Sequence, residues 1–101
     1  LWDAAKQMTS ELVLSVRLLI MAFENMGKNN VEVQRYIGSI NDQERLIDQM
    51  DYANFRRILM SDMDHKGILL MRGLTESLEK AADASNSCAE TLTVLIIARG
   101  A

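Results

Sequence analysis

Apolar side chains recur at helical spacing along three stretches of this chain, and two polar breaks separate the stretches. In the first stretch, about residues 1–27, they repeat every three or four positions, as on the buried face of a helix. The repeating positions are Leu1, Ala5, Met8, Leu12, Leu19, Ala22 and Met26. Four further residues widen this face: Val13, Val16, Ile20 and Phe23. We therefore expect a long helix with more apolar surface than one packing seam requires.

The second stretch, about residues 31–60, and the third, about residues 66–99, show the same spacing. The second repeats through Val33, Ile37, Ile40, Ile47, Phe55, Ile58 and Leu59. The third repeats through Met71, Leu74, Leu78, Ala82, Ala89, Leu92 and Ile96. Each stretch fits a helix of roughly 25–30 residues, about 40 Å long at 1.5 Å per residue.

The two breaks carry residues that end and begin helices. In the first break, Gly27 can end a helix, and Asn29 or Asn30 can cap the next one. The second break, residues 61–67, gathers Ser and Asp side chains before Gly67. Because short links make consecutive helices antiparallel neighbours, the pattern predicts an all-α, up-down-up three-helix bundle, with one domain over residues 1–101.

The chain has 101 residues, of which 49% are hydrophobic, and it contains no proline. A chain of this size hides only about two thirds of its unfolded surface, so wide apolar helix faces leave some apolar surface over. We therefore expect either self-association or packing against a second three-helix repeat.

Charge and cysteine content narrow the function further. The formal net charge of −3 argues against nucleic acid as the main partner. The single cysteine, Cys88, can form no internal disulfide, which fits a reducing compartment. The longest apolar run, residues 18–23, is far shorter than the roughly 20 residues that cross a bilayer.

Acidic residues interrupt the apolar face of the second stretch. The spacing of its apolar residues leads next to Glu44, with Asp48 one turn later and Asp51 nearly one turn after that. Residues four apart stack on one helix face. Two carboxylates in such a position repel each other unless a proton or a cation lies between them.

The third stretch repeats this spacing at Glu79 and Asp83, with Glu76 one turn earlier. The two Glu-x-x-x-Asp pairs lie equally far from the second break, so an antiparallel hairpin places them at the same level, facing each other. An oxygen-rich site of this kind suits iron, manganese, magnesium or calcium. In the alternative interpretation these acids are solvated and pair locally with bases such as Arg45 and Lys80.

At these acidic residues the chain resembles the PhoU-like phosphate-transport regulators. Residues 78–85, the sequence Cys88-Ala89-Glu90 and residues 97–101 are similar to the last helix of that family. Residues 40–48 resemble its preceding acidic helix. The branch with the strongest resemblance is that of the accessory proteins of the low-affinity inorganic phosphate transporter (Pit).

The resemblance implies a fold of two three-helix repeats, of which this chain is the C-terminal one. It implies Glu44, Asp48, Glu79 and Asp83 as ligands for iron, manganese or magnesium. It also implies a non-enzymatic regulator of phosphate transport that works in the cytoplasm at the inner face of the membrane. The implied partners are a phosphate transporter or its signalling proteins.

A second hypothesis needs no metal. In it the chain is a generic helical interaction module, such as a chaperone or scaffold domain. An enzyme is disfavoured, because no nucleophile and base stand together in the sequence. The only histidine, His65, falls in the predicted second break, where capping is its expected role.

Overall fold

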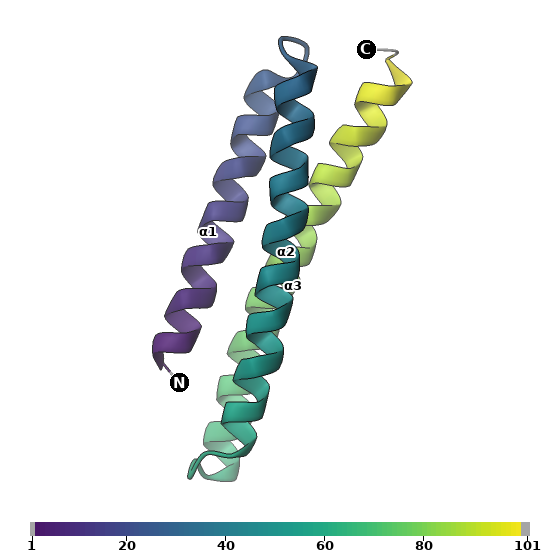
Figure 1. Cartoon of the computed structure of the whole chain (residues 1–101). Coiled ribbons are helices and arrows are strands. Elements are labelled where there is room, and N and C mark those ends of the chain that lie inside the picture. The colour runs from purple at the N-terminus through teal and green to yellow at the C-terminus, as the bar shows by residue number, and fades with distance from the viewer. Residues whose placement is uncertain (1, 100–101) are drawn as a thin grey trace.

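The computed structural model describes residues 2–99 and contains three long helices joined by two short turns (Figure 1). The helices are α1 (Trp2–Asn25), α2 (Asn30–Leu59) and α3 (His65–Ala98). Every pair of helices is in contact, within a rod of 55 × 20 × 16 Å. The predicted all-α three-helix bundle is therefore confirmed, with helix ends close to those expected. Leu1, Gly100 and Ala101 lie outside the described residues.

Local chemistry at the two turns fixes where the helices end and begin. Gly27 has a φ of 75°, which glycine adopts without steric cost. The side chain of Asn29 accepts a hydrogen bond from the backbone N–H of Glu32 at 3.2 Å. The side chain of Asp64 accepts one from the backbone N–H of Gly67 at 2.7 Å. Asn29 and Asp64 thus cap α2 and α3, each satisfying an N–H group that the helix leaves unpaired.

The apolar core is divided into two clusters along the rod. The larger cluster contains Ala22, Val33, Ile37, Ile40, Ala89, Leu92 and Ile96. The smaller cluster contains Met8, Ile47 and Ala82, with Leu12, Met50 and Leu78 packed against it. Most of these positions belong to the predicted apolar faces. Leu59 and Leu74 were also expected there but are exposed, because the buried seams pass instead through Asn54, Ile58 and Thr75.

A polar contact lies between the two clusters. The buried hydroxyl groups of Ser15 and Ser85 are hydrogen-bonded at 3.1 Å, so neither is left unsatisfied. Since one serine belongs to α1 and the other to α3, the contact sets the level of these two parallel helices. Along the bundle axis, each residue of α1 is therefore at about the same height as the α3 residue whose number is larger by 70.

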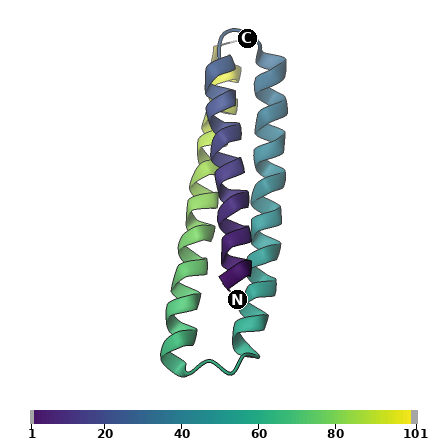
Figure 2. The ribbon, with the colours of Figure 1, turned by 90° about the vertical axis from the view of Figure 1, so that its left-hand side faces the viewer.

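The α2–α3 hairpin is longer than α1, with helices of 30 and 34 residues against 24. Two views at right angles both show the hairpin extending past the N-terminal end of α1 (Figures 1 and 2). Side chains near the hairpin turn, including Met60 and Leu69, are accordingly exposed. Within the described part of the chain, none of the helices has the length and apolar character needed to cross a membrane.

The larger core cluster can be tested with Ile40, which is fully buried. Ile40→Val removes one methyl group and should lower the free energy of unfolding by about 1 kcal/mol, because a small cavity remains. Urea unfolding followed by circular dichroism measures this change. Val31→Ala is the control, because the Val31 side chain is 72% exposed and should change stability little. Equal effects of the two substitutions would contradict the described core.

Candidate functional site

Five acidic side chains meet between α2 and α3. Glu44, Asp48 and Asp51 come from α2, and Glu79 and Asp83 come from α3. The carboxyl group of Glu79 is within hydrogen-bonding reach of Asp48 and Asp51. The carboxyl group of Glu44 is likewise within reach of Asp83. The structure therefore brings the two predicted pairs face to face, and it adds Asp51 to them.

The five carboxyl groups differ in their exposure to solvent. Asp48 and Asp83 are exposed, Glu44 and Glu79 are half-buried, and Asp51 is buried. A solvated helix face thus describes Asp48 and Asp83 but not the other three acids. Desolvation without a countercharge disfavours an ionised carboxylate, so the inner members of this group need protons or cations.

The carboxyl group of Glu79 is neutralised by a proton, because its pKa is raised. A hydrogen bond with Asp51, the partial burial of Glu79 and a second hydrogen bond with Asp48 raise the pKa of Glu79 to about 8. Negative charge on both aspartates acts in the same direction. At neutral pH the protonated carboxyl of Glu79 therefore donates a hydrogen bond to an aspartate carboxylate.

The pKa of Glu44 is also raised. Burial is the largest cause that raises the pKa of Glu44, followed by a hydrogen bond with Asp83 and by repulsion from Asp48 and Asp83. Arg45, next in sequence, opposes this rise. Nη1 of Arg45 lies 3.7 Å from Oδ1 of Asp42, and both side chains are largely exposed. The predicted local pairing of Arg45 thus involves an acid outside the group of five.

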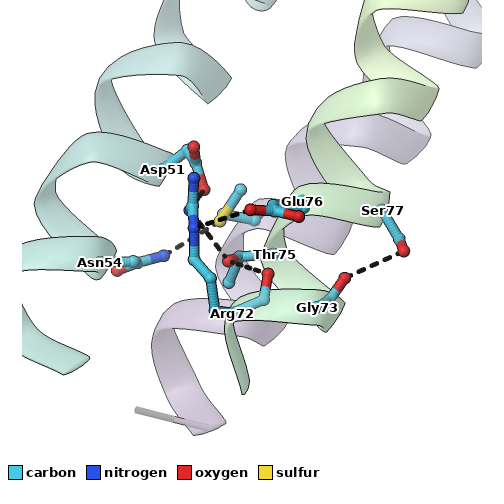
Figure 3. A network of polar contacts seen from close by, with 8 residues as sticks. Asp51, Asn54, Arg72, Gly73, Thr75, Glu76 and Ser77 are labelled. Atoms are coloured by element: carbon cyan, nitrogen blue, oxygen red, sulfur yellow. Dashed lines mark hydrogen bonds and ion pairs between the residues drawn. The ribbon is translucent and has the colours of Figure 1, made fainter. Parts of the chain in front are cut away.

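The cation nearest the buried acid is Arg72 of α3 (Figure 3). Its Nη1 lies 2.8 Å from Oδ1 of Asp51, and its Nε lies 3.2 Å from Oε1 of Glu76. The guanidinium group also lies over the ring of Phe55, 4.6 Å from the ring centre, in a cation–π contact. Asp51 is therefore shared between a fixed positive charge and the proton of Glu79.

Further polar contacts lie beside this network, and one of them reaches α1. The side-chain amide of Asn54 donates to Sδ of Met8 at 3.0 Å, and both residues are buried. The hydroxyl of Thr75 donates to the backbone carbonyl of Arg72 at 3.1 Å, and Arg72 Nη1 lies 3.3 Å from the same hydroxyl. Polar contacts near Asp51 thus link α2 both to α3, through Arg72, and to α1, through Asn54 (Figure 3).

Arg72 was not among the predicted site residues, although the sequence contains a signal for it. The hairpin rule that places residue 44 level with residue 83, and 48 level with 79, also places residue 72 level with residue 55. Phe55 is the aromatic ring that Arg72 covers. Asp51 lies one turn from this level, within reach of a long arginine side chain.

The acidic residues form two neighbouring sets and not a single preformed metal-coordination site. Glu44 meets Asp83, while Glu79 meets Asp48 and Asp51. Within residues 2–99, no group of three or more acid, histidine or cysteine side chains has the arrangement of a metal site. Hard cations need several converging oxygen ligands. Holding one here requires side-chain rotation and loss of the proton on Glu79.

Comparison with known proteins gave no relative. No protein-family model, curated protein or solved structure matches the chain.

The raised pKa values predict how stability depends on pH. Between the ordinary glutamate value of 4.5 and about 8, folded Glu79 keeps a proton that the unfolded chain releases. The contribution of Glu79 to stability is therefore fully present below pH 4.5 and is lost as pH rises through about 8. Thermal unfolding followed by circular dichroism should show Tm falling from about pH 5 to about pH 8.5.

Glu79→Gln should remove most of this slope, because glutamine keeps a hydrogen-bond donor and does not titrate. Glu24→Gln, a substitution on the exposed side of α1, should leave the slope unchanged. A Glu79→Gln protein with the same slope as the wild type would show that Glu79 does not hold the proton.

Arg72 provides a separate test of the buried acid. Arg72→Met leaves the side chain of Asp51 buried without its cation, and should lower the free energy of unfolding by about 2 kcal/mol. Adding Asp51→Asn removes the unpaired charge and should recover much of that loss. Urea unfolding of both variants measures the difference. A double variant less stable than Arg72→Met alone would contradict this assignment.

Proposed function

We propose that this chain is a non-enzymatic regulatory module of inorganic phosphate transport, in which the carboxylates between α2 and α3 exchange their protons for a hard metal cation. The proposal rests on the facing Glu-x-x-x-Asp pairs in an up-down-up bundle, which is the arrangement implied by the resemblance to PhoU-like regulators. Glu44, Asp48, Glu79 and Asp83 are the proposed ligands, and iron, manganese and magnesium are the proposed ions.

The observation that supports a cation most directly is the excess of acid at this site. Five carboxyl groups gather there, and the arginine paired with the buried acid, Arg72, is engaged with Asp51 and Glu76. The hydrogen bond with Asp51, partial burial and the hydrogen bond with Asp48 raise the pKa of Glu79 to about 8, and repulsion from the two aspartates adds to this rise. A divalent cation would relieve the same repulsion that the proton now relieves, and oxygen ligands suit hard cations.

Such an exchange would give the module a means of regulation. A cation held by both acidic pairs would link α2 to α3 across their interface, whereas protons neutralise the acids without linking more than two at a time. Because ligating carboxylates must be deprotonated, cation binding would release protons and would strengthen as pH rises. The proposed partners, a phosphate transporter or its signalling proteins at the inner face of the membrane, follow from the family resemblance.

A second candidate is a helical interaction module that binds no metal, such as a scaffold or chaperone domain. It is favoured by the large apolar side chains that α1 and α3 expose, among them Ile20, Phe23, Val94 and Ile97. On this proposal the acidic group serves the packing of α2 on α3 and has no ligand. The two candidates differ in their response to cations.

The first test is thermal stability in the presence of Mn²⁺, Mg²⁺ or Fe³⁺. A cation that binds only the folded chain must raise Tm in proportion to the logarithm of its concentration above Kd. We expect such a rise for at least one of the ions at pH 8, and a smaller rise at pH 6. The double variant Asp48→Asn/Glu79→Gln should abolish it.

Asp42→Asn is the matched control, since Asp42 is an exposed α2 acid that contacts Arg45 outside the site. It should respond to cations as the wild type does. No rise in Tm for the wild type with any of the three ions would exclude the cation exchange and favour the metal-free module. Co-purification with a phosphate transporter from membranes tests the partner separately.

A further inference from the structure

The exposed side of α1 carries a second apolar seam that no other helix covers. Residues Thr9, Val13, Val16, Ile20 and Phe23 follow one another in steps of four and three, so they share one side of the helix. All five are exposed and none is charged. The seam that packs inside the bundle uses different positions, including Met8 and Ser15.

The same pattern occurs on α3. Its outer seam runs in steps of four and three through Leu74, Ser77, Ala81, Ala84, Cys88 and Thr91. These residues are also exposed and uncharged. The flanks of α2 differ, since equivalent steps there meet charged residues such as Glu32, Arg45 and Asp48. A second uncharged seam is therefore confined to α1 and α3.

The two outer seams lie side by side on one surface, which we call the α1–α3 face. At one end, Trp2 of α1 lines an apolar hollow together with Leu70 and Leu74 of α3. At mid-height, the Ser15–Ser85 contact sets α1 and α3 at matching levels. The flanks opposite the outer seams, which carry Glu11 on α1 and Glu79 on α3, contact α2, so both outer seams lie on the sides of α1 and α3 away from α2.

We propose that the α1–α3 face is the interface of a two-fold symmetric dimer, in which the outer seam of α1 in one copy packs on the outer seam of α3 in the other. The four-three seams are uninterrupted between Thr9 and Phe23 on α1, before Lys6 breaks the pattern, and between Leu74 and Thr91 on α3. Such seams are the pattern by which helices pack knobs into holes. In the described chain, α1 and α3 are the helices that offer such seams without using them, which makes a second copy the matching occupant.

The shapes of the two seams support this pairing. At mid-height the α1 seam offers Val13 and Val16, whereas the α3 seam offers the small residues Ala81 and Ala84. Rotation of one copy about an axis parallel to the helices places α1 of each copy opposite α3 of the other. The valines of α1 in each copy then pack on the alanines of α3 in the other copy. The same contact therefore forms twice, as a self-complementary two-fold interface requires.

The exposed apolar area of the α1–α3 face is large enough to form the core of a dimer interface. Its large exposed side chains are Trp2, Val13, Val16, Ile20, Phe23, Leu70, Leu74 and Leu95. They are between 37% and 67% exposed. Since a whole aromatic side chain covers roughly 150–250 Å² and an aliphatic one less, they leave several hundred Å² exposed per copy, a large share of the roughly 800 Å² that each partner contributes to a standard stable interface. Monomeric proteins rarely leave an apolar patch of this size uncovered.

Analytical ultracentrifugation of the whole chain at about 50 μM, within the range of such interfaces, tests the proposal. The wild type should sediment with twice the mass of the 11.4 kDa chain. Val16→Glu should sediment as a monomer with unchanged helical content by circular dichroism, because Val16 lies outside the core of the single chain. Val31→Glu, at an exposed position of α2, should remain dimeric.

A charge-pairing experiment tests the arrangement of the helices. Val16→Lys and Ala84→Glu should each weaken the dimer, and their mixture should form a heterodimer in which the new lysine of one copy meets the new glutamate of the other. Failure of the mixture to associate would exclude the packing of α1 on α3. A monomeric wild type, or a Val16→Glu protein that remains dimeric, would overturn the proposal.

If the wild type is monomeric and instead binds vesicles that contain anionic lipid, the α1–α3 face is a membrane surface and the dimer is excluded. None of these results depends on a cation or on phosphate transport. The dimer and the proposed function can therefore fail independently.

Discussion

The buried carboxylate of Asp51 sets the conditions that the rest of the α2–α3 interface must meet. Its side chain is only 9% exposed, on a helix face where an apolar residue would otherwise pack. A buried charge of this kind is costly unless a cation or hydrogen bonds compensate it. Arg72 supplies the charge and Glu79 supplies a proton, and both come from α3. The partners of one residue thus fix the level of α3 against α2 and draw the neighbouring acids together.

Polar contacts and apolar clusters have different roles along the rod. The apolar clusters around Ile40 and Ile47 supply most of the stability, but such side chains tolerate sliding of one helix past another. The Ser15–Ser85 contact and the network around Asp51 are specific in direction, so a shift by one turn leaves buried polar groups unsatisfied. On this argument the polar layers select one register from several that the core alone allows.

The sequence predicted the fold and the meeting of the acidic pairs because both depend on simple geometry. Helix periodicity, two capped turns and equal distances from a hairpin turn were sufficient to place Glu44 opposite Asp83. The burial of Asp51 and the reach of Arg72 were not predicted, because they depend on side-chain packing between helices that are distant in sequence. Leu59 and Leu74 were placed in the core for a related reason. They were predicted to be buried because they are apolar. The continuous four-three spacing of buried positions passes instead through Ile58 and Thr75.

Helix α3 takes part in both surfaces proposed to have a function, since its acids face α2 on one flank and its small residues lie on another. This arrangement has a thermodynamic consequence. If a cation at the acidic site and dimer formation each favour a particular position of α3, the cation must change the affinity of the dimer, and dimer formation must change the affinity for the cation by the same factor. If α3 is held rigidly by Asp51 and by Ser85, the coupling is zero and the two surfaces act independently. The strength of the polar layers therefore decides whether one surface can regulate the other.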